Sequence, residues 1–132
     1  MRKAIIAVLL LGLLIAGCGP GAELASCRSV ADTFMERLAK GDQLGAYELC
    51  DPNALSMDSL RTIASNPDFA DLMNDYKGLE HGDGGQKDEK DEGDEVRLAP
   101  ATAKGHDNFT LHFAFRKEPA GWRVIGFKID RK

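Results

Sequence analysis

The segment Asn108–Arg116 reads NFTLHFAFR, and large apolar residues occupy every second position of it. Successive side chains of a β-strand point to opposite faces of the sheet, so this spacing predicts a strand with one apolar face. The apolar face carries Phe109, Leu111, Phe113 and Phe115, and the opposite face carries Thr110, His112 and Ala114. We therefore expect the apolar face to cover the core and His112 to point outward.

A second strand is expected over Trp122–Asp130, after the turn-forming sequence Glu118-Pro119-Ala120-Gly121. Two strands joined by so short a turn predict an antiparallel hairpin. Strict alternation assigns Ile125, Phe127 and Ile129 to one face of this strand, and Trp122 and Val124 to the other. Trp122 and Val124 would then share the outward face with His112, as a mixed apolar patch that favours association.

Helical patterns precede these strands. Apolar residues recur there at three- and four-residue steps, which is the period of an amphipathic helix. The expected helices run over about Glu23–Lys40, 42–50, Ser56–Ser65 and 66–76. Gly41-Asp42 should join the first two as antiparallel neighbours, and Pro52 should stop the second. Helices followed by antiparallel strands predict an α+β fold, with the helices packed on one face of a curved sheet.

The region between the helices and the hairpin is polar. Residues 80–95 contain four glycines and many acidic side chains, which predicts a flexible acidic loop. Residues 95–103 read as a weak strand that contains Pro100, which fits a sheet edge or a bulge.

The start of the chain carries a separate signal. Met1-Arg2-Lys3 is followed by an apolar run over 4–16 and then by Ile15-Ala16-Gly17-Cys18. A basic start, a short apolar core and small residues form the secretory signal pattern, and the run is too short for a spanning helix. The last four residues resemble the lipobox of bacterial lipoproteins. The resemblance implies a signal peptide over 1–17, acylation of Cys18, and a short tether over 18–22.

The same resemblance bears on location and partners. Gly19 stands where an aspartate would favour the inner membrane, which implies the periplasmic face of the outer membrane. Removing Arg2 and Lys3 would take the formal net charge from −4 to about −6. A domain with this negative charge is not expected to bind nucleic acid or anionic lipid surfaces, because their charge is also negative. Acyl chains on Cys18 would therefore provide the attachment to the bilayer.

Two further cysteines remain in a compartment that oxidises thiols. Cys27 lies near the start of the first expected helix and Cys50 near the end of the second. Antiparallel packing would bring these ends together, so we expect a Cys27–Cys50 disulfide. The alternative is a pair of buried free thiols that behave as small hydrophobic side chains.

Three stretches together resemble the nuclear transport factor 2-like superfamily. The opening helical pair contains VADTF at 30–34, LAKGD at 38–42 and Ala46-Tyr47; the later stretches are FTLHF at 109–113 and GWRVIGF at 121–127. The resemblance implies one cone-shaped, cystatin-like α+β domain over 23–132. Together with the lipobox-like sequence, the domain resembles small periplasmic lipoproteins of that superfamily. Members of the superfamily include isomerases, dehydratases and binding domains. Fold alone therefore leaves the activity open.

Few residues are candidates for binding or catalysis. The candidates for pocket or partner contacts are Tyr47, Arg61, His112 and Trp122. Tyr47 could offer a hydroxyl, Arg61 could bind an anion, and Asp32 should be solvated. The three histidines lack metal-ligand spacing, and the acidic loop departs from the calcium-loop pattern, so no metal, cofactor or catalytic residue is expected.

Three functions remain open at this stage. The first is a membrane-anchored periplasmic lipoprotein whose domain binds a small ligand or an envelope protein without catalysis. The second is a small isomerase- or hydratase-type enzyme, which needs an Asp or His inside the cone. The third is a structural or inhibitory envelope protein that works through the outward hairpin face and could pair there with a second copy.

Overall fold

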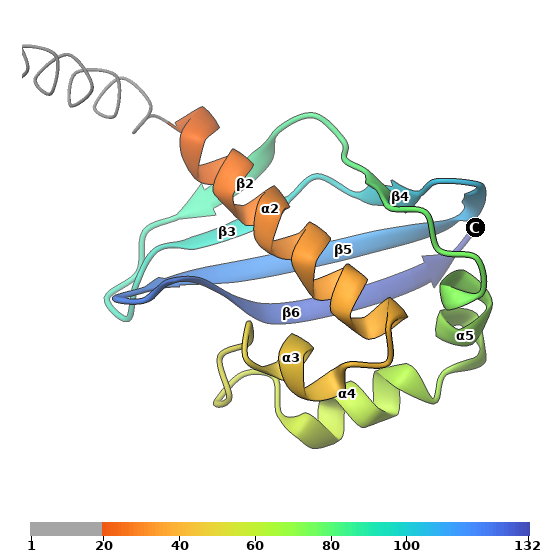
Figure 1. Ribbon diagram of the computed structural model, residues 1–132. Coiled ribbons are helices and arrows are strands. Elements are labelled where there is room, and N and C mark those ends of the chain that lie inside the picture. Colours follow the sequence, from red (N-terminus) through yellow and green to blue (C-terminus); the bar gives the residue numbers. More distant parts are fainter. Residues whose placement is uncertain (1–19) are drawn as a thin grey trace, which may run out of the picture.

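The computed structural model describes residues 20–132, and the predicted signal peptide and Cys18 lie outside the described residues. Helices come first and strands follow (Figure 1). The elements are α2 (Pro20–Ala39), α3 (Gln43–Tyr47), α4 (Met57–Ala64), α5 (Pro67–Met73), β1 (Leu79–Glu80), β2 (Gly85–Asp88), β3 (Glu95–Leu98), β4 (Ala101–Ala103), β5 (His106–Glu118) and β6 (Gly121–Arg131). Among residues 20–132, no helix has the length and apolar character that crossing a membrane requires.

Local capping explains where the helices begin and end. Gly41 follows α2 with φ +78°, a conformation that favours glycine, and the Asp42 side chain accepts a hydrogen bond from the Gly45 amide. Ser56 caps α4, and Asn66 caps α5 ahead of a proline in its first turn. These starts are confirmed as predicted. The second and fourth helices end earlier than predicted, at Tyr47 and Met73.

The six strands form one antiparallel sheet with β5 at its centre. β6 pairs along one side of β5, whereas β3 and β4 pair with different parts of its other side. β2 extends the sheet beyond β3, and β1 extends it beyond β4. Pro100 lies in the break between β3 and β4, where it removes a backbone donor. The predicted α+β class, with helices on one face of an antiparallel sheet, is confirmed.

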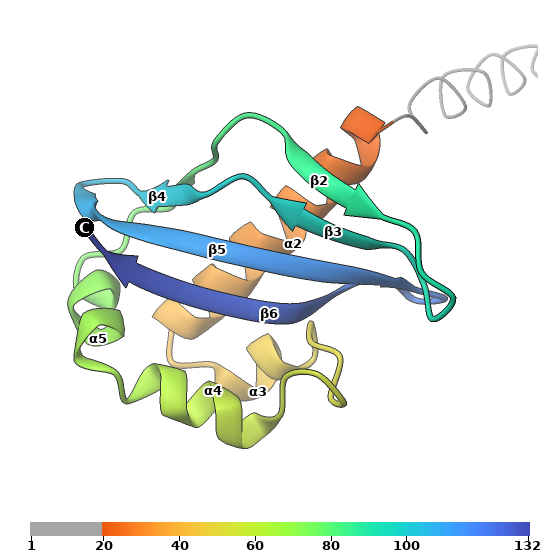
Figure 2. The ribbon, with the colours of Figure 1, turned by 180° about the vertical axis from the view of Figure 1, so that it is seen from behind.

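The core lies between α2 and the sheet. α2 crosses one face of the sheet, and no helix of residues 20–132 lies on the other face (Figures 1 and 2). The alternating apolar face of β5 is buried, as predicted: Phe109, Leu111, Phe113 and Phe115 are each at most 3% exposed. From α2, Phe34 contacts Phe127 and Phe113 edge-on, with ring centroids 5.5 and 6.4 Å apart. These aromatic side chains fill the interior of the cone.

The acidic region is more ordered than predicted. The prediction of a flexible loop over 80–95 is wrong for Gly85–Asp88. This segment forms β2 and pairs with β3 from Gly85↔Leu98 to Asp88↔Glu95. The edge position explains why the apolar pattern is absent, since the β2 side chains remain largely exposed and bury no core surface. Lys87 also bridges to Glu23 on α2, with 2.9 Å between Nζ and Oε1.

The tether is also shorter than predicted. Residues 18–22 were expected to be non-helical, but Pro20, Gly21 and Ala22 belong to α2. Proline is favoured in the first helical turn because its missing N–H has no partner there in any case. The first helix of the described chain therefore begins two residues after Cys18.

The outward position predicted for Trp122 and Val124 is wrong. The β5–β6 register passes from Ala114↔Gly126 to Phe115↔Val124, so Ile125 is an extra residue in a β-bulge. The extra residue reverses the alternation, and Val124 and Trp122 therefore share the core side with Phe127 and Ile129. Val124 is fully buried and Trp122 packs against the core.

The predicted Cys27–Cys50 disulfide is also wrong, because both residues are free, buried thiols. Cys27 lies about 18 Å from the end of α2 along the helix axis. α3 has only 5 residues, so it is too short to bring Cys50 back to the level of Cys27. Cys50 instead lies beside β6, in a bridge to Val124, and its thiol hydrogen-bonds the Ala46 carbonyl. Burial raises the pKa of Cys27 and of Cys50 to about 12, so both thiols stay protonated at neutral pH.

Candidate functional site

A surface groove lies along the C-terminal half of α2. A hollow of about 410 Å³ is lined by Glu36, Ala39, Lys40, Met73, Tyr76, Lys77 and Gly78. A neighbouring hollow of about 240 Å³ shares Glu36, Tyr76, Lys77 and Gly78 and adds Asp32, Leu79 and Lys104. We call the two hollows together the α2 groove. It is open to solvent and separate from the filled interior of the cone.

A histidine–aspartate pair lies at the edge of the groove. His81, just after β1, places Nε2 2.7 Å from Asp32 Oδ1 on α2. A carboxylate can only accept a hydrogen bond, so Nε2 donates to Asp32. The other ring nitrogen, Nδ1, is buried and has no hydrogen-bond partner within residues 20–132. Since neither nitrogen is open to a ligand, His81 holds Asp32 in place and is not positioned to act as a general base.

Charges of both signs face the α2 groove. Its carboxylates belong to Asp32 and Glu36 on α2, and its ammonium groups to Lys40, Lys77 and Lys104. Tyr76 lines both hollows of the groove. Burial, together with the nearby Asp32 and Glu36, raises the pKa of its phenol, which therefore stays neutral and can donate a hydrogen bond. The groove can thus contact positive, negative and neutral polar groups of one ligand.

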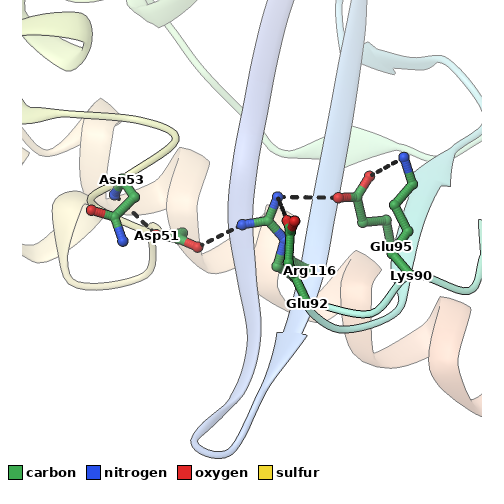
Figure 3. Close-up of polar contacts among 6 residues, drawn as sticks. All are labelled: Asp51, Asn53, Lys90, Glu92, Glu95 and Arg116. Carbon is green, nitrogen blue, oxygen red and sulfur yellow. Dashed lines mark hydrogen bonds and ion pairs between the residues drawn. The ribbon is translucent and has the colours of Figure 1, made fainter.

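A second polar cluster surrounds Arg116, at the hairpin end of the sheet (Figure 3). Its guanidinium lies 3.1 Å from Asp51 Oδ2 and 3.1 Å from Glu95 Oε2, and Glu92 approaches to 4.0 Å. Asp51 also accepts the Asn53 amide at 2.9 Å. Asp51 is the one buried polar or charged residue among 21–132. The cluster ties the loop after α3 to β5 and β3, which is a structural role.

Two carboxyl groups of this cluster compete for a proton. A hydrogen bond to Glu118, the Asn53 amide and Arg116 together hold the pKa of Asp51 below its usual range. The same hydrogen bond to Asp51, with burial and the Asp51 charge, raises the pKa of Glu118. The folded protein therefore binds a proton on Glu118 more tightly than the unfolded chain does.

Glu118→Gln should stabilise the protein at pH 7 by about 0.5 kcal/mol, because it removes one of two neighbouring negative charges. Stability of the wild type should rise as pH falls from 7 toward the raised pKa of Glu118, and fall at lower pH as Asp51 is protonated. The stability of the Glu118→Gln variant should not rise as the pH falls from 7, but it should still fall at lower pH as Asp51 is protonated. Urea denaturation at several pH values measures both effects; identical pH profiles for the two proteins would contradict the assignment.

The four residues singled out in the sequence do not come together. Tyr47 packs against the core, and Arg61 pairs with Asp58 on the exposed side of α4. His112 lies on the uncovered face of the sheet, 3.1 Å from Asp130. Trp122 lies on the core side, at the opposite end of α2 from the groove. Within residues 20–132, no group of three His, Cys, Asp or Glu side chains is placed to hold a metal.

His81 and Tyr76 were not among the candidate residues expected from the sequence. His81 lies in the glycine-rich region that predicted a loop, 49 residues from Asp32, so no local spacing links the two. The sequence pattern predicted Tyr76 as an apolar position of the fourth helix, but that helix ends at Met73. A positive φ of 72° at Asp75 and of 112° at Gly78 marks the turn that presents Tyr76 to the groove.

The fold is that of known structures. The chain is similar to an NTF2-like protein with a cystatin-like fold from Novosphingobium aromaticivorans, at 16% identity and a TM-score of 0.54, covering 95% of this chain and 87% of that one. It is also similar to a putative dehydratase from the NTF2-like family from Streptomyces avermitilis, at 13% identity and a TM-score of 0.50, covering 86% and 99%. No protein-family model and no curated protein matches the sequence. Identities this low establish the cystatin-like cone fold alone, which suits both binding domains and enzymes.

Proposed function

We propose that this protein is a lipid-anchored binding protein of the bacterial cell envelope, on the periplasmic face of the outer membrane. Its NTF2-like domain binds a small ligand or an envelope protein without transforming it. The anchor is the lipobox-like sequence ending at Cys18, and the ligand site is the α2 groove.

The orientation of His81 carries the non-catalytic part of this proposal. Proton transfer needs a base whose free nitrogen reaches the substrate, and Nδ1 of His81 is buried against protein. The interior of the cone, where such a base would be desolvated, is filled by Phe34, Phe113 and Phe127. These two observations favour binding over an isomerase- or hydratase-type reaction.

The charges of the groove favour a small ligand that carries both a positive and a negative group. Glu36 of the groove, like Lys40 and Lys104, makes no ion pair within residues 20–132. A ligand with both charges could therefore pair with groups that solvent alone now satisfies. A ligand of one sign would meet repulsion from one wall.

The test is nuclear magnetic resonance of the amide groups, with L-lysine, L-glutamate and phosphoethanolamine as probes. At least one probe should shift the Gly78 amide, and the double variant Asp32→Asn/Glu36→Gln should weaken that binding about tenfold. Glu48→Gln, an exposed acid outside the groove, is the matched control and should bind as the wild type does. Probes that leave the groove amides unshifted at millimolar concentration would contradict the ligand site. A turnover that His81→Gln abolishes would contradict the non-catalytic proposal.

The uncovered face of the sheet is the second candidate site, for a protein partner or for a second copy of the chain. A hollow of about 440 Å³ on the sheet is lined by Arg97, Leu98, His112, Phe113, Ala114, Gly126, Phe127 and Lys128. The β6 bulge turns Trp122 and Val124 away from this face, so it is more polar than the sequence predicted. Pairing across it would therefore depend on complementary charges, among them Lys128 and Asp130.

A further inference from the structure

A third hollow marks the end of the molecule where the described chain begins. It has a volume of about 370 Å³ and is lined by Ala22, Glu23, Ser26, Lys87, Asp94, Lys117 and Trp122. We call this surface the Trp122 end. The first turns of α2 and both hairpin turns, β2–β3 and β5–β6, lie at this end in both views (Figures 1 and 2).

The Trp122 end lies next to the predicted lipid. Cys18 precedes Pro20 by two residues, so its Cα lies within about 7 Å of the first residue of α2. Ala22 and Glu23, two and three residues further on, already line the hollow. A lipid on Cys18 would therefore keep this end near the bilayer, whereas the α2 groove begins about 15 Å further along α2, at Asp32.

The charges that line the hollow cancel, whereas the β2–β3 turn at the same end is acidic, with Glu89, Asp91 and Glu92 against Lys90. Lys87 Nζ lies 2.9 Å from Glu23 Oε1 and 3.5 Å from Asp94 Oδ2. Lys117 Nζ lies 5.9 Å from the centroid of the Trp122 ring, over its face. Two lysines and two carboxylates line the hollow, so the Trp122 end as a whole keeps the negative charge of the turn. Such a surface is repelled by anionic lipid, and a zwitterionic headgroup layer does not repel it.

The Trp122 side chain suits an interface between apolar and aqueous layers. One side of its ring packs against the core, and the rest borders the hollow. Indole rings are enriched at the headgroup level of bilayers, because they are apolar and also carry one hydrogen-bond donor.

We propose that the Trp122 end is a membrane-contact surface that docks on the headgroup layer of a zwitterionic bilayer. Contact there fixes the orientation of the domain, so that the α2 groove points away from the membrane. This inference rests on the proposed lipid anchor at Cys18.

Trp122 is the one tryptophan of the chain, so its fluorescence reports this surface alone. The lipidated protein is reconstituted into phosphatidylcholine vesicles, with and without a nitroxide on the lipid headgroup. Because interfacial tryptophans lie at headgroup depth, Trp122 emission should shift to shorter wavelength and lose about half its intensity to the nitroxide. The matched control is Trp122→Phe/Tyr76→Trp, which moves the fluorophore to the α2 groove and should show little quenching.

Vesicle flotation separates the two ways in which the inference could fail. Protein that does not float with the vesicles would overturn the lipid anchor and the docking surface together. Protein that floats while Trp122 is quenched no more than the tryptophan at position 76 would overturn the docking surface and leave the anchor standing. Floating protein with selective quenching of Trp122 supports both.

Discussion

A Cys18→Ser chain is expected to accumulate as an uncut precursor without lipid when it is expressed in a Gram-negative bacterium. Acylation requires the sulfur of Cys18, and the lipobox-like sequence implies that cutting follows acylation. Labelling with a palmitate analogue should fall to background, and the gel mobility should match that of the full 132-residue chain. The loss should be complete, because a hydroxyl is no substitute for the acylated thiol.

The other two cysteines supply a matched control for this experiment. Cys27→Ala and Cys50→Ala should each be cut and labelled like the wild type, because both thiols are buried in the folded domain. Each replacement also keeps a small apolar side chain at a buried position, so the domain should still fold. Normal cutting and labelling of Cys18→Ser would overturn the lipoprotein proposal, whatever the other variants show.

The fold was predictable because its strongest signals are local. The alternation of β5 and the helix starts at Ser56 and Asn66 are read within a few positions, and each is confirmed. Three errors arose where a distant contact decides the outcome. β2 depends on pairing with β3, α3 ends early against β6, and the position of Cys50 follows from its bridge to Val124.

The candidate site was harder to predict than the fold. The α2 groove joins Asp32 to His81 and Lys104, which are brought together only when β1 and β4 pair. Neither histidine spacing nor charge pattern carries that information, since the two partners of the pair lie 49 positions apart. Conversely, four candidate residues were chosen by residue type alone, and the fold places them apart from one another. They are Tyr47, Arg61, His112 and Trp122.

The most destructive single change that we predict is deletion of Ala114 from β5. A one-residue slip moves every side chain beyond it to the opposite face of the sheet. Either Phe115 or the whole segment Phe109–Phe113 would then leave the core, and β5 has partners on both sides that cannot follow. Exposing Phe115 alone costs about 3–5 kcal/mol. That is a large part of the 5–15 kcal/mol by which a domain is usually stable.

Deletion of Ile125 from β6, at the same level of the sheet, should by contrast be tolerated. Ile125 is the extra residue of the bulge, so its removal leaves Gly126 opposite Ala114 and Val124 opposite Phe115. Trp122 and Val124 would stay on the core side of the sheet, and regular alternation would continue through β6. We expect a loss of about 1 kcal/mol or less in the free energy of unfolding. Urea denaturation followed by circular dichroism compares the two deletions, and a ΔIle125 protein as unstable as ΔAla114 would show that the bulge is not where the register places it.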